Sequence, residues 1–350
     1  NLCSIPMKRP LKIIISGGGT GGHIFPAIAI AREIRARDPR TEILFVGATG
    51  RMEMEKVPQA GFRIEGLPVE GFRRKFTLRN ILVLFNFFRS LRKAKQILLE
   101  FRPDAVVGVG GYASGPVVRA ASEKGLPVLL QEQNSYAGIT NRFLARKANR
   151  ICGAYEGMER YFPASRIILT GNPVREDMVR TGAPGKEAGE YFGFSDEKPV
   201  VLVLGGSLGA KTINESIFRN IGLIESSEIR VIWQTGSLYF RDIRQKIQEM
   251  PLKNLVFMDF INRMDLAYAV ADVIVSRAGA GTISELCLVG KPVILVPSPN
   301  VAEDHQTKNA MALVNKGAAI LVKDAEAFTE LIPEAFKLVS DRERRASLEK

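Results

Sequence analysis

The chain has few of the residues from which metal centres and disulfide frameworks are built. Its 350 residues include two histidines and three cysteines, the latter being Cys3, Cys152 and Cys287. An odd number of widely spaced cysteines, with no C-x-x-C pair, excludes a disulfide framework and the ordinary zinc spacings. We therefore expect small apolar thiols in a protein of a reducing compartment, and no metal site.

Long apolar runs are missing as well. No segment reaches the roughly 20 apolar residues of a membrane span, and the first residues carry no cleavage site, so we expect no signal peptide. The sequence has no G-x-x-x-x-G-K-[ST] loop, no Asp-x-Asp motif and no glycosidase-like pair of carboxylates. Hydrolases and ATPases thus lose their usual support, and a transfer reaction that needs no metal remains.

Acidic residues are scarce in the first part of the chain. Residues 1–150 carry 25 lysines and arginines against 11 aspartates and glutamates, whereas residues 151–350 carry 24 against 26. The net charge of +12 therefore belongs to the first part. Such a surplus predicts an anionic partner for that part: a membrane, a nucleic acid or a phosphorylated ligand.

What the chain does contain is a recurring strand–loop–helix pattern. Apolar runs such as residues 11–16 (LKIIIS) and 199–204 (PVVLVL) precede glycine-rich loops and segments with helical spacing of apolar residues. Alternating strands and helices predict parallel sheets with helices on both faces. The pattern is interrupted at residues 168–177 (ILTGNPVRED). We expect an α/β protein with two doubly wound parallel-sheet domains, 1–168 and 169–350, facing a cleft.

The first glycine loop, SGGGTGGHIFP, follows a predicted strand and opens a predicted helix. Gly17, Gly19 and Gly22 fit G-x-G-x-x-G, in which bare backbone amides and a helix N-terminus hold phosphate oxygens. Dinucleotide-binding domains share this spacing but need an acidic residue at the end of the second strand. That strand ends at Gly47 and the next acidic residue is Glu53, too far along, which disfavours a nicotinamide oxidoreductase.

Three further loops repeat this context. Residues 108–111 (GVGG), 205–209 (GGSLG) and 276–281 (SRAGAG) each follow a predicted strand and precede a helix. Several such loops favour phosphate contacts on both sides of a cleft. After the last loop, Glu285 lies one turn into the helix, where a carboxylate can accept hydrogen bonds from both ribose hydroxyls while the helix dipole faces the phosphates.

The two histidines stand at the same kind of place. His23 and His305 each follow a strand and lie near the start of a predicted helix. Imidazole titrates near neutral pH and suits general base catalysis. His23, beside the first glycine loop, is the predicted catalytic base.

Seven stretches, in order from residue 16 to about residue 310, carry a family resemblance. They are SGGGTGGHIFPAIAIA, GVGGYASGP, QEQNSYAGITNR, TGNPVR, GGSLGAKTIN, SRAGAGTISEL and EDHQTKNA. Through them the sequence closely resembles the MurG family of peripheral membrane glycosyltransferases. The resemblance implies a GT-B fold of two Rossmann-like domains around a cleft, with no metal and no cofactor besides the donor substrate.

The resemblance also implies a reaction. N-acetylglucosamine (GlcNAc) would pass, with inversion, from UDP-GlcNAc to the C4 hydroxyl of N-acetylmuramic acid (MurNAc) in lipid I, which is undecaprenyl-diphospho-MurNAc-peptide. The products would be UDP and lipid II, which serves peptidoglycan synthesis, cell shape and cell division. The implied partners are UDP-GlcNAc, lipid I and an anionic membrane surface at the cytoplasmic face of the cell membrane, with other proteins of cell-wall synthesis as candidates.

The resemblance assigns roles to residues of the quoted motifs. His23 would be the base on the attacking hydroxyl. The first two glycine loops would hold the acceptor diphosphate through Gly18, Gly19, Gly110, Gly111 and Tyr112. The donor would be bound by a larger set: Thr20, Gly21, Gly22, Asn134, Arg175, Gly206, Ser207, Ile261, Ala280, Gly281, Thr282, Glu285, His305 and Gln306.

Within the donor set the expected contacts differ. Arg175 and the Ser207 loop would hold the UDP diphosphate, and the backbone of Ile261 would recognise uracil. Gln306, together with His305, would bind GlcNAc hydroxyls. The family often has Gln where this chain has His305, and it usually continues past the last residue here into a helix that packs back on the first domain.

Residues 71–95, GFRRKFTLRNILVLFNFFRSLRKAK, account for much of the positive charge. An apolar cluster lies between two groups of basic residues and is too short to span a bilayer. It fits a segment that dips into a membrane interface with its cations on anionic headgroups, and it also fits a helix buried in the core. The resemblance favours membrane contact through Phe76, Arg79, Ile81, Leu82, Phe85, Phe88 and Arg89.

Other functions stay open from the residues alone. An adaptor that binds a nucleotide sugar without turnover would have the same loops, and galactosyltransferases that act on diacylglycerol resemble the MurG family too. A nucleic acid is not expected as a partner, because no recognised binding motif accompanies the basic segment.

Overall fold

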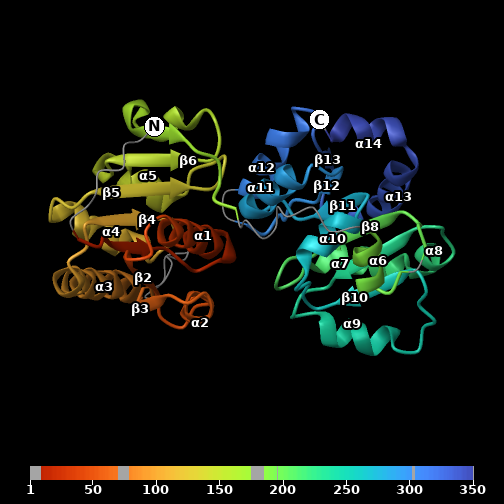
Figure 1. Cartoon of the computed structure of the whole chain (residues 1–350), viewed down its shortest axis with the longest axis horizontal. Coiled ribbons are helices and arrows are strands. Elements are labelled where there is room, and N and C mark those ends of the chain that lie inside the picture. The colour runs from red at the N-terminus through yellow and green to blue at the C-terminus, as the bar shows by residue number, and fades with distance from the viewer. Residues whose placement is uncertain (1–8, 70–78, 175–184, 195, 302–303, 350) are drawn as a thin grey trace. The chain divides into compact units, whose positions relative to one another are not determined.

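The structure, a computed structural model, describes residues 9–69, 79–174, 185–194, 196–301 and 304–349 (Figure 1). Its internal contacts divide the chain into two units, Asn1–Val174 and Arg175–Lys350. The sequence placed the boundary between residues 168 and 169. The unit boundary comes later because the strand at Ile167–Leu169 pairs with the first sheet.

Unit 1 is built on a seven-stranded parallel sheet with the order β3-β2-β1-β4-β5-β6-β7 (Figure 1). Its strands are β1 (Lys12–Ser16), β2 (Glu42–Ala48), β3 (Arg63–Leu67), β4 (Ala105–Gly108), β5 (Val128–Glu132), β6 (Arg150–Gly153) and β7 (Ile167–Leu169). Its helices are α1 (Gly21–Arg37), α2 (Glu53–Gln59), α3 (Arg79–Phe101), α4 (Ser114–Glu123) and α5 (Ile139–Leu144), with the short 3₁₀ helices η1 (Ala145–Lys147), η2 (Met158–Arg160) and η3 (Ala164–Arg166).

Helices cover both faces of this sheet. Successive residues of a strand point to opposite faces, so Ile14 packs into a core shared with α3, α4 and α5, whereas Ile13 and Ile15 pack into a core shared with α1 and α2. Strands buried on both faces are expected to be rich in Ile, Val and Leu, as the KIIIS sequence of β1 is.

Unit 2 repeats this plan on a six-stranded parallel sheet with the order β10-β9-β8-β11-β12-β13. Its strands are β8 (Val200–Leu204), β9 (Arg230–Gln234), β10 (Leu255–Met258), β11 (Val273–Ser276), β12 (Val293–Leu295) and β13 (Ile320–Leu321). Its helices are α6 (Gly185–Tyr191), α7 (Lys211–Arg219), α8 (Ile221–Glu225), α9 (Phe240–Ile247), α10 (Met264–Val270), α11 (Ala280–Val289), α12 (His305–Val314), α13 (Ala327–Ser340) and α14 (Arg342–Leu348).

The faces of the second sheet are covered in the same way. Val201 and Val203 pack against α7, α8, α9 and α13, and Leu202 packs against α6, α10, α11 and α12. The sequence prediction of two doubly wound α/β units is therefore confirmed.

In each sheet the order in which strands are added reverses at the first strand. β1 lies between β2 and β4, and β8 lies between β9 and β11. In open parallel sheets, ligands bind beyond the carboxyl ends of the strands at such a switch point. The four glycine loops follow β1, β4, β8 and β11, so the fold brings all of them to the two switch points.

Candidate functional site

The helices that follow the four glycine loops begin without the usual side-chain caps. The residues before α1, α4, α7 and α11 are Thr20, Ala113, Ala210 and Gly279, and none of them accepts a hydrogen bond through its side chain. None of the four helices has an acidic residue in its first turn, whereas α9 and α10 do. First-turn N–H groups have no acceptor within the helix, so these four N-termini are suited to anions.

The first two glycine loops pack against each other. A Cβ atom at Gly111 would lie 2.1 Å from the carbonyl oxygen of Gly18, and one at Gly17 would lie 2.1 Å from Val109 Cγ2. Gly111 also has a φ of +78°, which side chains disfavour. Part of the glycine requirement in the predicted acceptor loops therefore comes from the contact of loop with loop.

A buried carboxylate holds the first glycine loop. Glu53 is 1% exposed, and its two oxygens each accept the N–H of Gly19 at 3.1 Å, while Oε1 also accepts the N–H of Ala48 at 2.9 Å. The Gly19 amide is thus occupied within the protein. The N–H groups of Gly21 and Gly22 lie in the first turn of α1, where they have no acceptor within the helix.

The predicted base, His23, is held by a glutamine that the sequence analysis did not single out. Nδ1 of His23 lies 3.2 Å from Oε1 of Gln133, and Nε2 of Gln133 donates to the carbonyl oxygen of Val109 at 2.8 Å. Because Gln133 presents an oxygen to the ring, Nδ1 carries the proton in the neutral imidazole and Nε2 carries the lone pair. His23 thus has the tautomer that a general base needs on Nε2.

The loop after β5 that carries Gln133 also carries Asn134, a predicted donor residue. The carboxylate of Glu132 holds this loop. Glu132 is 1% exposed and accepts hydrogen bonds from Asn134 N at 3.1 Å, Gly138 N at 3.0 Å and Asn141 Nδ2 at 2.9 Å. With Nδ2 of Asn134, which donates at 3.3 Å, four hydrogen bonds to one buried carboxylate restrain the conformation of this loop. The motif QEQNSYAGITNR contained Glu132 and Gln133, but nothing in its spacing separated them from the other polar residues.

A small cavity lies beside the first two glycine loops. It has a volume of about 130 Å³ and is lined by Gly18, Gly19, Ala48, Arg51, Val69, Tyr112 and Ala113. Tyr112, a predicted acceptor residue, is 54% exposed. The structure adds Arg51, whose guanidinium group is suited to binding phosphate oxygens. A lone arginine after a strand gave no sequence signal.

In unit 2, the loop after β8 lies against the end of β9. Gly206 has a φ of +81°, and the carbonyl oxygen of Ser207 accepts the N–H and the hydroxyl of Ser237 at 3.1 and 3.2 Å. Ile261 is buried, and its N–H donates to Oε1 of Gln234 at 3.3 Å. Ile261, the residue predicted to recognise uracil, therefore lies at the carboxyl end of the same sheet, beside Gln234 at the end of β9.

An ion pair ties the other donor loop to α7. Arg277, directly after β11, donates to the carbonyl oxygens of Val296 and Pro297 at 3.1 and 3.2 Å and pairs with Asp324. Asp324 also accepts the hydroxyl hydrogen of Thr212, in the first turn of α7, at 2.9 Å. One carboxylate thus fixes the start of α7 relative to the loop that begins α11. Arg277 lies in the predicted SRAGAG loop but was not singled out there, and Asp324 lies outside the quoted motifs.

The remaining predicted donor residues lie along two helices of unit 2. Ala280, Gly281 and Thr282 form the first turn of α11, and Glu285 lies in the second turn, half-buried. His305 and Gln306 begin α12, and the side-chain oxygen of Gln306 accepts the N–H of Ser298 at 2.9 Å. Arg175 lies outside the described residues.

The predicted membrane segment is described in part. Phe76 lies outside the described residues, and the same holds for the side chains of Arg79, Ile81 and Leu82. Phe85 and Phe88 on α3 are 59% and 57% exposed, and the guanidinium group of Arg89 lies 5.9 Å from the Phe85 ring centre.

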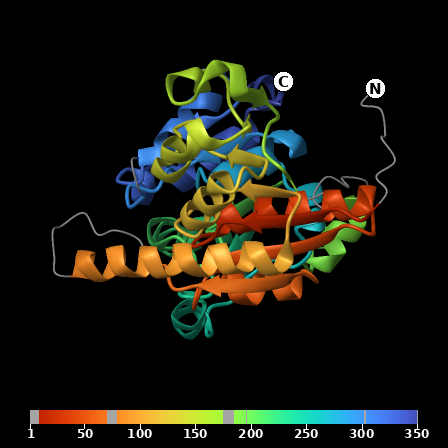
Figure 2. The ribbon, with the colours of Figure 1, turned by 90° about the vertical axis from the view of Figure 1, so that its left-hand side faces the viewer.

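Helix α3 nevertheless has a buried face. Val83, Ala94 and Leu98 are each less than 5% exposed. The expectation of a buried helix therefore fits one side of α3, and the expectation of membrane contact fits the side with the exposed rings. Figure 2 shows one end of α3 projecting past the other elements of unit 1. Within the described part of the chain, no helix has the length and apolarity needed to cross a membrane.

No metal-binding cluster stands out. Among the residues that the structure describes, no three His, Cys, Asp or Glu side chains gather in a way that would hold a metal ion. Cys152 and Cys287 are not joined to another cysteine, and burial raises the pKa of both thiols above the usual value, which keeps them in the unreactive protonated form.

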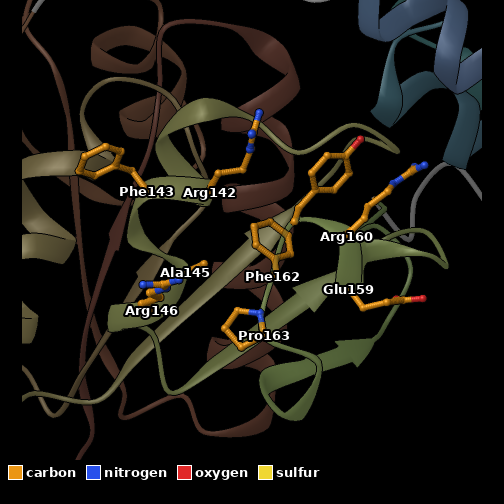
Figure 3. Close-up of a pocket in the computed structure, with 9 residues that line it drawn as sticks. Arg142, Phe143, Ala145, Arg146, Glu159, Arg160, Phe162 and Pro163 are labelled. Carbon is orange, nitrogen blue, oxygen red and sulfur yellow. The ribbon is translucent and has the colours of Figure 1, made fainter.

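A larger pocket lies beside α5 (Figure 3). It has a volume of about 660 Å³, and its lining residues come from α5, η1 and the segment around η2: Arg142, Phe143, Ala145, Arg146, Glu159, Arg160, Tyr161, Phe162 and Pro163. The sequence analysis did not predict it, because these residues belong to three elements with no common motif.

Comparisons with known proteins agree with this geometry. Residues 13–152 match the glycosyltransferase family 28 N-terminal domain, and residues 200–350 match the glycosyltransferase family 28 C-terminal domain. Among solved structures, MurG of Acinetobacter baumannii is similar with a TM-score of 0.76 and 29% identity, over 97% of this chain and 94% of that one.

Two curated relatives are more similar in sequence. Both are named UDP-N-acetylglucosamine–N-acetylmuramyl-(pentapeptide) pyrophosphoryl-undecaprenol N-acetylglucosamine transferase. The protein of Parabacteroides distasonis is 56% identical over 97% of this chain and 92% of its own length, and that of Cytophaga hutchinsonii is 53% identical over 99% and 93%. The predicted resemblance is therefore confirmed: this chain has the GT-B fold and belongs to the MurG family of glycosyltransferases.

Proposed function

We propose that this chain transfers GlcNAc from UDP-GlcNAc to the C4 hydroxyl of the MurNAc of lipid I, releasing lipid II and UDP. The observation that carries the proposal is the 52–56% identity, over nearly the whole chain, to relatives whose names all specify this one reaction. The geometry of each unit supports it, with unit 1 serving the acceptor and unit 2 the donor.

On the acceptor side, His23 acts as the base. Its Nε2 lone pair, set by the hydrogen bond between Nδ1 and Gln133, takes the proton of the C4 hydroxyl. The C4 oxygen then forms a bond to C1 of GlcNAc as the bond from C1 to the UDP oxygen breaks, so the anomeric centre inverts. Arg51 and Tyr112, which line the cavity beside the first two glycine loops, would hold the diphosphate of the acceptor.

On the donor side, the electron pair leaves with UDP. The uncapped N-termini of α7 and α11 would stabilise the growing negative charge on its phosphates. Glu285 would accept hydrogen bonds from the ribose hydroxyls. Since the oxygen of Gln306 is bonded to Ser298 N, its NH₂ group is the one that would donate to a sugar hydroxyl.

The acceptor's undecaprenyl chain requires the enzyme to work at a membrane. The exposed Phe85 and Phe88, with Arg89 beside them, support contact of α3 with the cytoplasmic face. The enzyme would then be a peripheral protein of that face. UDP-GlcNAc and lipid I are its substrates in this proposal, and no separate cofactor is part of it.

The test is UDP release with a short-chain lipid I analogue and four donors: UDP-GlcNAc, UDP-Glc, UDP-Gal and UDP-GalNAc, each with and without EDTA. We expect turnover with UDP-GlcNAc alone, unchanged by EDTA. Turnover of UDP-Gal with diacylglycerol in place of lipid I would contradict the proposed acceptor. Binding of UDP-GlcNAc without turnover of any acceptor would support the adaptor instead.

A further inference from the structure

The pocket beside α5 has no role in the transfer step, yet its lining is that of a binding site. Its lining includes three arginines, Arg142, Arg146 and Arg160, and one acidic residue, Glu159. In Figure 3, the side chains of Arg142 and Arg160 extend in the same general direction, with Phe162 and Pro163 below them. A net positive pocket with aromatic walls suits an anion that also has apolar parts.

Two of the arginines are held in place by aromatic rings. The guanidinium group of Arg142 lies 5.6 Å from the ring centre of Tyr161 and 6.0 Å from that of Tyr136. That of Arg160 lies 4.9 Å from the Tyr161 ring. Guanidinium groups that stack on rings keep their N–H edges available for a carboxylate or phosphate.

The pocket adjoins the loop that holds the predicted base. Arg160 donates to the carbonyl oxygen of Ser135 at 3.0 Å, and Ser135 follows Asn134 in the loop after β5. Two residues before Ser135, Gln133 contacts His23. An extended five-residue peptide spans up to about 17 Å, whereas the two residues from Gln133 to Ser135 cover at most about 7 Å.

Size distinguishes the kinds of anion that this pocket would hold. A volume of about 660 Å³ falls in the range of roughly 300–1,000 Å³ that is typical of sites for whole small ligands. A single phosphate group fills only a small part of it, whereas a short peptide uses the aromatic walls as well as the charges. A peptide also brings a terminal carboxylate that is ionised at neutral pH.

We propose that this pocket binds the peptide of the acceptor, with the peptide's carboxylate on Arg142 and Arg146 and its backbone and side chains against Phe162 and Tyr161. The proposal rests on the proposed function, because the relatives are named for an acceptor that carries a pentapeptide. Glu159, at the other rim, would pair with an amino group of that peptide. The pocket would thus set how well the enzyme discriminates among acceptor peptides.

The experiment compares two soluble short-chain acceptors in detergent, one with the pentapeptide and one with the MurNAc carboxyl group blocked as its methylamide. Initial rates are measured for the unaltered chain, Arg142→Gln, Arg146→Gln and the double variant. Lys147→Gln is the matched control, because Lys147 adjoins Arg146 and loses the same charge but does not line the pocket. Turnover of the methylamide acceptor shows that each variant is folded.

We expect each single variant to raise KM for the pentapeptide acceptor by about 3- to 10-fold and the double variant by about 30-fold, as for charge-assisted contacts near a surface. KM for the methylamide acceptor and both kcat values should stay within about 2-fold, and Lys147→Gln should behave like the unaltered chain.

Three results would overturn the proposal. One is an equal change of KM for both acceptors, and another is no change for either. The third is a loss of binding of the double variant to vesicles of phosphatidylglycerol, with unchanged kinetics in detergent, since the pocket would then be a lipid headgroup site. If the unaltered chain turns over neither acceptor, the proposed function itself fails, which is a different outcome from all three.

Discussion

Unit 1 and unit 2 share the order of their first six strands but differ in the charge of the surrounding chain. In both, the central strand carries a glycine loop and an uncapped helix, and so does the strand across the switch point. The surroundings differ: residues 1–150 have a surplus of 14 basic residues and residues 151–350 have a deficit of 2. The fold supplies four helix N-termini that are suited to anions, and we propose that the residues around them determine which anion each one holds.

The two units also stabilise their loops differently. In unit 1, the carboxylate of Glu53 accepts the backbone N–H of Gly19, so it bonds directly to the backbone of the loop. In unit 2, Asp324 reaches the loops through the side chains of Arg277 and Thr212. Loss of Glu53 should therefore affect the acceptor loop, and loss of Asp324 should affect the donor loops.

The largest expected effect is that of His23→Ala in unit 1. If His23 is the base, kcat should fall by about 10²- to 10⁴-fold with little change in KM for either substrate. Its counterpart in unit 2, His305→Ala, should instead raise KM for UDP-GlcNAc and leave kcat within about 10-fold. A small change in kcat with a raised acceptor KM for His23→Ala would mean that His23 orients the diphosphate.

Glu53→Gln should come next. The substitution keeps the shape but turns an NH₂ group toward the N–H groups of Gly19 and Ala48, so it should lower the free energy of unfolding by about 1–3 kcal/mol and raise the acceptor KM. Urea denaturation and initial rates measure the two effects. A raised KM for UDP-GlcNAc at constant acceptor KM would break the assignment of this loop.

Asp324→Asn should affect the donor instead of the acceptor, and by a smaller factor. Removing one charge of the pair with Arg277, whose two side chains are 16% and 21% exposed, should raise KM for UDP-GlcNAc by about 10-fold, equivalent to about 1.4 kcal/mol. The acceptor KM should stay constant. Matching changes in both KM values would indicate a general loss of structure, which circular dichroism of the variant would detect.

Substitutions of exposed apolar residues should affect membrane binding in unit 1 but not in unit 2. Phe85→Ser with Phe88→Ser should weaken binding to vesicles with anionic lipids by about 10-fold or more, because each ring no longer buries apolar area in the interface. Leu223→Ser in unit 2, where Leu223 is 45% exposed, is the control and should change nothing. Equal weakening by the control would contradict a membrane face confined to unit 1.

The smallest expected effect concerns pH. Hydrogen bonds from Lys95 on α3 and from Arg119 on α4 lower the pKa of Glu123 from 4.5 to about 2. A carboxyl group whose pKa is depressed in the folded state stabilises the fold above its unfolded pKa, and this stability is lost as the pH falls from about 4.5 to about 2. Glu123→Gln should therefore flatten the acid side of the stability curve, followed by urea midpoints. An unchanged acid slope would contradict this role.

The sequence predicted the fold further than it predicted the site. Strands such as KIIIS and VVLVL are long enough and apolar enough to be read directly, and each led into a glycine loop. The strands β3, β6, β7 and β13 were missed. RIEGL has few apolar residues, and RICG, IIL and IL are too short for a periodic pattern.

In the site, motif residues such as His23 could be named, but their partners could not. Gln133 lies 110 residues from His23, and Asp324 lies 47 residues from Arg277. Such contacts depend on which strands become neighbours in the sheet, and one sequence does not reveal side-chain pairs across it. Glu53 was noted only as too distant for a ribose, and its bond to the Gly19 amide appears once β1 and β2 are paired.

The central claim is that unit 1 receives the acceptor and unit 2 the donor. Hydrogen exchange of the backbone amides tests it most directly, with the full chain measured alone, with UDP and with a lipid I analogue in detergent. We predict that UDP slows exchange at residues 205–212 and 279–285, and that the lipid I analogue slows it at residues 17–23 and 110–114. Protection of the unit 1 loops by UDP alone, with the unit 2 loops unchanged, would contradict the claim.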